Sequence, residues 1–122
     1  MAVRSLAAAC ALLALLGAAC AAELADALQM QRTLKDTYGA ASDPQVSLVN
    51  GQKALRVRLE GPRFAALSDS TAERMAHEVA VFVIQHYGHQ AELDTVSISL
   101  VISRTGPVRM TQDHAFAAAA LR

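Results

Sequence analysis

The sequence predicts a small α+β domain in which helices pack on one face of a sheet, with the elements in the order helix, strand, strand, helix, strand. Three observations predict it: apolar alternation on both sides of an Asn-Gly pair at residues 45–59, an amphipathic helix at residues 71–87, and a third alternation at residues 96–103. A short fourth strand and a C-terminal helix are expected in the weakly defined tail, residues 104–122. The chain has 122 residues, enough for one such domain.

The N-terminal segment has the features of a secretory signal peptide. Arg4 supplies a positive start, residues 6–16 form an unbroken apolar run, and small residues follow. The run is short of the roughly 20 residues that a membrane span needs, so cleavage is favoured over anchoring. Small residues at the required positions allow cleavage after Ala19 or after Ala22. We therefore expect a signal peptide over residues 1–22, a domain over residues 23–122, and a periplasmic or secreted protein.

Cysteine use leaves one alternative open. Cys10 and Cys20 are the only cysteines, so the exported domain is expected to lack disulfides and thiolate sites. Residues 16–20 resemble the bacterial lipoprotein box, although the leucine lies four residues before Cys20 and not three. Either Cys20 is a small residue of the discarded peptide, or it carries a lipid that attaches an outer-membrane lipoprotein to the membrane.

The charge balance excludes one class of partner. Removal of Arg4 with the signal leaves 10 of the 11 Lys and Arg residues against 11 Asp and Glu residues. No basic excess favours nucleic acid, and no block of like charge indicates a disordered tail. The expected partners are therefore an envelope protein or a second copy of the chain, with membrane attachment only through a lipid on Cys20.

The first mature residues predict a helix followed by a hairpin. An apolar stripe at helical spacing covers residues 23–38, and Gly39 is expected to end this helix. Asn50-Gly51 then favours a two-residue turn, because both positions need a positive φ. Such a turn pairs Val46 with Leu55 and places the apolar residues of both strands on one face. These are Val46, Leu48, Leu55, Val57 and Leu59.

Capping signals and a third alternation predict the remaining elements. Ser70 and Glu73 have the spacing of a capping box, so the second helix is expected from about Thr71 to Tyr87. Two apolar residues on its polar side, Val81 and Ile84, indicate a second contact there. The third strand alternates apolar residues with serines. Beyond it, Val108 and Met110 favour a short fourth strand, and Asp113 is expected to cap a terminal alanine-rich helix.

This order of elements resembles the BON domains, which are small periplasmic modules associated with envelopes and phospholipid surfaces. The resemblance covers residues 24–102 and rests on Val46, Leu48, Asn50, Gly51, Val57, Leu59 and Gly61. The chain departs from the family in its longer second helix and in residues 88–94, which replace the usual Gly-Val approach to the last strand. The resemblance implies a fold and a compartment and identifies no site.

The histidines offer the one arrangement that favours a metal or hydrolytic site. His86 and His89 are three residues apart, with Glu92 and Asp94 close behind. Gly88 interrupts the helix between them, and His86 falls on the apolar face of the helix, so a structural histidine is the preferred interpretation. No nucleophile elbow, phosphate-binding glycine loop or cofactor motif occurs, and we expect neither an enzyme nor a bound cofactor.

The outer face of the sheet is the preferred binding surface. Arg56 and Arg58 point away from the core, as do Ser97 and Ser99 on the third strand. The plain interpretation is a solvated face, and the functional interpretation is a flat, mildly cationic docking surface. Apolar area on the same side, from Val49, Ala54 and Val101, favours docking. The sequence therefore predicts an exported, non-enzymatic binding or assembly module whose ligand it does not identify.

Overall fold

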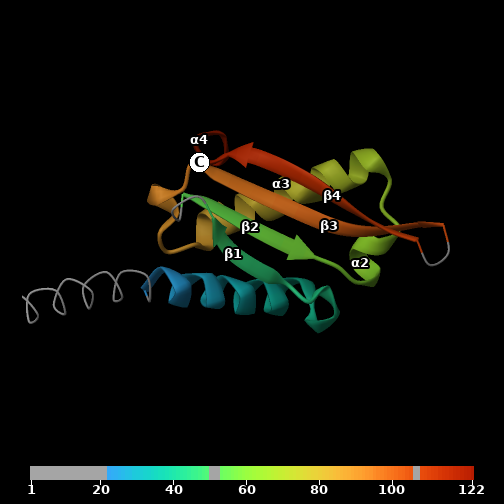
Figure 1. Cartoon of the computed structure of the whole chain (residues 1–122), viewed down its shortest axis with the longest axis horizontal. Helices are drawn as coiled ribbons and strands as arrows, with labels where there is room; N and C mark the ends of the chain where they lie inside the picture. The colour runs from blue at the N-terminus through green and yellow to red at the C-terminus, as the bar shows by residue number, and fades with distance from the viewer. Residues whose placement is uncertain (1–21, 50–52, 106–107) are drawn as a thin grey trace, which may run out of the picture.

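The computed structural model describes residues 22–49, 53–105 and 108–122, and shows a small α+β domain built on one four-stranded mixed sheet (Figure 1). The strands are β1 (Gln45–Val49), β2 (Ala54–Leu59), β3 (Thr95–Thr105) and β4 (Val108–Ala117). The helices are a first helix whose described part covers residues 22–38, α2 (Pro62–Ala65), α3 (Asp69–His86) and α4 (Ala118–Leu121). The predicted class and element order are confirmed. Among the described helices, none is long and apolar enough to cross a membrane.

The sheet has the spatial order β1-β2-β3-β4, with β1 and β4 at its edges. The two hairpins, β1–β2 and β3–β4, are antiparallel, whereas the central pair β2–β3 is parallel. A parallel pair needs a crossover connection, which α2 and α3 supply. The helices pack on one face of the sheet, as predicted, and leave the other face open.

The first hairpin has a different register from the one expected from a two-residue turn. Val46 pairs with Val57 and Val49 pairs with Ala54, so residues 50–53 link the strands. The predicted pairing of Val46 with Leu55 is therefore wrong by two residues, and the Asn50-Gly51 pair itself lies outside the described residues. Side chains alternate with a period of two along a strand, so a shift of two keeps the same apolar residues on the core face. The predicted face is confirmed for this reason.

The helix α3 begins two residues before the predicted start. The Ser68 side chain accepts a hydrogen bond from the Thr71 N–H at 3.4 Å, and Asp69 lies in the first turn, where a negative charge is favourable. The expected capping box at Ser70 is therefore wrong, because an equivalent hydroxyl two residues earlier supplies the cap. At the other end the helix stops at His86, next to the predicted Tyr87.

The tail differs most from expectation. β4 is a strand of 10 residues, and Asp113 lies within it, opposite Ser99 of β3, and not at a helix N-terminus. The terminal helix is a single short segment, α4. Alanine favours helices, but pairing with the long strand β3 outweighs that local preference here.

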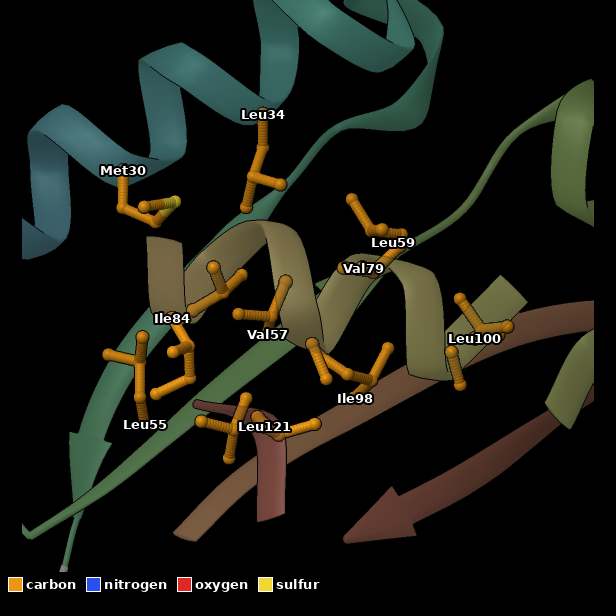
Figure 2. Close-up of a cluster of buried hydrophobic side chains, with 14 of the residues drawn as sticks. Met30, Leu34, Leu55, Val57, Leu59, Val79, Ile84, Ile98, Leu100 and Leu121 are labelled. Atoms are coloured by element: carbon orange, nitrogen blue, oxygen red, sulfur yellow. The ribbon is translucent and has the colours of Figure 1, made fainter. Parts of the chain in front are cut away.

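The core lies between the helices and the covered face of the sheet (Figure 2). Met30 and Leu34 of the first helix reach the same cluster as Val57 of β2 and Ile98 of β3, and all four are at most 1% exposed. At the end of the first helix, Tyr38 contacts the rings of Phe64 and Phe82. Ile84 is also buried and Val81 packs against the cluster, so the contact expected at these positions is confirmed.

Candidate functional site

The candidate site is the sheet face opposite the helices, called here the open face. It is formed by alternate residues of the four strands, and the register places Ser47, Arg56, Ser97 and Ala115 in one row across the sheet. The neighbouring row contains Gln45, Arg58, Ser99 and Asp113. Two adjacent rows of mostly polar side chains therefore run across all four strands.

These rows enclose a hollow of about 230 Å³ that is lined by Arg56, Ser97, Ser99 and Asp113, called here the open-face hollow. The Ser99 Oγ donates a hydrogen bond to Asp113 Oδ1 at 2.5 Å, which satisfies the hydroxyl of a residue that is only 7% exposed. The hollow thus brings together three of the four predicted binding residues. Asp113 is added by the structure, and it would have been found from the sequence if the tail had been interpreted as a strand.

The arginines of the open face differ in their partners. Arg58 Nη2 lies 3.7 Å from Glu60 Oε2, and Arg109 Nη1 lies 3.8 Å from the same oxygen. Such long pairs between partly exposed side chains contribute little to stability. Arg56 is exposed and makes no hydrogen bond or ion pair with any residue that the structure describes. Its guanidinium is therefore available to a ligand beside the open-face hollow.

Little of the apolar area expected on this face is exposed. Ala54 is 9% exposed, Val101 is 5% exposed, and Val49 is half-buried. The pair between Arg109 on β4 and Glu60 at the end of β2 reaches across β3, and both side chains line the same hollow as Val101. The exposed part of the open face is therefore mostly polar, and its exposed apolar area is smaller than the sequence predicts.

A larger hollow of about 340 Å³ lies where the chain leaves β2 for α2. Its lining consists of Ala41, Glu60, Gly61, Pro62, Ala65, Val101, Ser103 and Arg109. Gly61 has a φ of 105°, and a Cβ there would overlap the Ala41 carbonyl oxygen. The close approach of these two backbone segments shapes one wall of the hollow.

The two histidines of the alternative metal or hydrolytic site, His86 and His89, have different partners. His89 Nδ1 forms a hydrogen bond with Asp26 Oδ2 of the first helix, whereas His86 stacks on the Phe82 ring with the centroids 4.1 Å apart. His86 is exposed and not on the buried side, although its ring packs as expected of a structural histidine. In the part of the chain that the structure describes, no three His, Cys, Asp or Glu side chains are placed to hold a metal ion. Asp26 and His89 are separated by 63 positions in the sequence, so no local spacing indicated their pairing.

Next to the hydrogen bond between His89 and Asp26, Tyr87 is 3% exposed and lies within reach of several carboxylates. Burial, followed by the negative charges of Glu23, Asp26 and Glu92, raises the pKa of Tyr87 to about 12. The phenol is thus neutral at physiological pH. Asp26, Tyr87 and His89 thus join the first helix to the end of α3, and they serve the structure of the covered side.

Comparisons of the chain with protein-family models, curated proteins and solved structures found no significant match. The resemblance to BON domains therefore stays a prediction. The functional argument rests on the geometry of the open face.

Proposed function

We propose that this chain is an exported, non-enzymatic binding module of the cell envelope that holds a protein partner against the open face of its sheet. The observation that carries the proposal is the exposed Arg56, without a partner among the described residues, beside a hollow lined by Ser97, Ser99 and Asp113. The signal-like residues 1–22 support export, and the element order shared with BON domains supports an envelope location.

The size and chemistry of the open-face hollow favour a protein side chain over a free small molecule. Its volume of about 230 Å³ is below the roughly 300–1,000 Å³ of typical ligand pockets, and its lining is polar and not mainly apolar. Arg56 offers donors and Ser97 offers a hydroxyl, whereas Asp113 already accepts from Ser99. A carboxylate or carboxamide projecting from the partner satisfies these groups, since arginine binds carboxylates through paired hydrogen bonds.

Site-specific photocrosslinking in the envelope of the producing cell tests this proposal. A photoreactive residue replaces exposed Ser47, which lies in the same row as Arg56, and a control replaces exposed Gln85 on α3. We expect a discrete adduct from position 47, none from position 85, and loss of the adduct when Arg56→Glu and Arg58→Glu are added. Reversal of the exposed helix residues Arg32 and Arg74 changes the net charge equally and should leave the adduct intact. An adduct insensitive to Arg56 and Arg58 contradicts the proposal.

A second candidate function is a lipid-anchored accessory protein at the membrane surface. It is favoured by Leu24 and Leu28, which are 58% and 47% exposed and lie four residues apart on the first helix, soon after Cys20. A lipid on Cys20 would bring these two leucines to the bilayer interface, where exposed apolar side chains are stabilised. Labelling of the producing cell with a radioactive fatty acid tests this candidate. The wild-type protein should incorporate the label and the variant Cys20→Ala should not. A wild-type protein that carries no label would contradict it.

A further inference from the structure

The strand β4 forms a long, uncovered edge of the sheet. It pairs with β3 from Val108 to Ala117, and no strand pairs with its other side within the described residues. β2 stops at Leu59, opposite Leu100, whereas β3 continues to Thr105, so the far ends of β3 and β4 extend past β1 and β2 (Figure 1). An edge strand presents a row of unpaired N–H and C=O groups that another strand can bind.

The edge β4 carries few of the features that prevent such pairing. The opposite edge, β1, has five residues, and its Val46 N–H donates to Gln31 Oε1 of the first helix at 3.3 Å. β4 is twice as long and contains neither proline nor lysine, the residues that most often block an edge. Val108 and Met110 on β4 are 52% and 50% exposed, which leaves apolar area at this edge.

The charges of β4 are complementary to themselves in one antiparallel register. We propose that two copies of this chain pair antiparallel through β4, with Thr111 opposite Thr111 of the second copy. Arg109 of each copy then lies opposite Asp113 of the other, so two opposite-charge pairs form on the open face. Both side chains are exposed in the single chain, beside their contacts with Glu60 and Ser99 respectively. A shift of two residues in either direction separates these charges.

The remaining pairs of this register are compatible with a continuous sheet. Met110 lies opposite Gln112, and Val108 lies opposite His114, all on the face that the helices cover. In an antiparallel pair, two residues that lie opposite each other are either hydrogen-bonded or non-hydrogen-bonded. Thr111 can meet its copy in either way, and in both cases backbone hydrogen bonds complete the ladder. The two-fold axis is perpendicular to the sheet, and the two open faces therefore lie on the same side of the dimer. The dimer itself does not depend on the proposed function of that face.

Charge reversal with a mixing step tests the register. Sedimentation velocity of the chain purified from the producing cell should show a monomer–dimer equilibrium that depends on concentration. Arg109→Asp alone, or Asp113→Arg alone, turns two attractive pairs into two repulsive ones and should raise the dimer Kd by about tenfold or more. The two single variants mixed together restore opposite charges at both pairs, so the mixture should form heterodimers with near wild-type affinity.

The mixing step separates pairing between copies from damage within one copy. Arg109→Asp also removes the contact with Glu60, and Asp113→Arg removes the hydrogen bond from Ser99, but mixing two chains repairs neither contact. Far-ultraviolet circular dichroism of each variant verifies that it is folded. A protein that is monomeric at all concentrations, a dimer unaffected by the single reversals, or a mixture that fails to associate would each overturn the proposal. A dimer lost instead with Arg56→Glu and Arg58→Glu would also overturn it, by placing self-association on the open face.

Discussion

The two faces of the sheet are built from alternate residues of the same strands, yet their surroundings differ sharply. On β3, Ile98 and Leu100 are fully buried under the helices, whereas Ser97 and Ser103 on the other side of the same strand retain contact with solvent. The covered face is apolar throughout the cluster of Figure 2. The open face carries arginines, serines and an aspartate in rows that cross all four strands.

The comparison separates the residues that stabilise the fold from those that we propose for recognition. Burial of the apolar face supplies most of the favourable free energy of folding, so its residues are chosen for volume and hydrophobicity. Ser99 and Asp113 satisfy one another, while Arg56 has no described partner and adds nothing comparable to the core. Substitutions on the two faces should therefore have very different effects on stability.

The largest expected effect comes from truncating the covered face. Ile98→Ala removes a fully buried side chain from a central strand and should lower the free energy of unfolding by about 2–5 kcal/mol. The neighbouring change Ser97→Ala on the open face should cost no more than about 0.5 kcal/mol. Urea unfolding of both variants measures the contrast, and similar losses would show that the open face is also part of the core.

The next effect concerns the point where the chain leaves β2 beside the larger hollow. Gly61→Ala places a Cβ against the Ala41 carbonyl oxygen at a φ of 105°, and the φ strain alone should cost about 1–3 kcal/mol. Gly39 has a φ of 93°, but a Cβ added there would have no atom within 4 Å, so Gly39→Ala should cost the backbone strain only. Thermal melts should rank Gly61→Ala as the less stable variant, and the opposite order would contradict this packing.

A smaller effect should appear at alkaline pH on the covered side. The pKa of Tyr87 is about 12 in the folded chain and about 10 in an unfolded one, so its stabilising contribution is complete below pH 10 and is lost as the pH rises from 10 through 12. The chain has two tyrosines and no tryptophan, and burial also raises the pKa of Tyr38. In chemical unfolding between pH 9 and 11.5, the wild type should lose stability more steeply than Tyr87→Phe. Equal slopes would show that Tyr87 is not desolvated.

Local sequence patterns were sufficient to predict which residues form the covered face. Alternation identified its apolar residues even though the hairpin register was wrong by two, because that error preserves the face. The fourth strand was underestimated, because pairing with β3 over 10 residues is a long-range contact that outweighs the helical preference of alanine.

The candidate site was predicted only in part, for the same physical reason. Arg56, Ser97 and Ser99 followed from alternation within β2 and β3. Asp113 reaches the open-face hollow only because β4 pairs with β3. Contacts between residues far apart in the sequence leave no local spacing to detect.

The most direct test of this division measures stability and binding in one variant that carries Arg56→Glu and Arg58→Glu. Both side chains lie on the open face, so the free energy of unfolding should change by no more than about 0.5 kcal/mol. The photocrosslink from position 47 should nevertheless disappear, because two negative charges then face the partner's acceptor group. A crosslink that persists at the wild-type yield, or a variant that loses several kcal/mol of stability, would contradict the assignment of recognition to the open face.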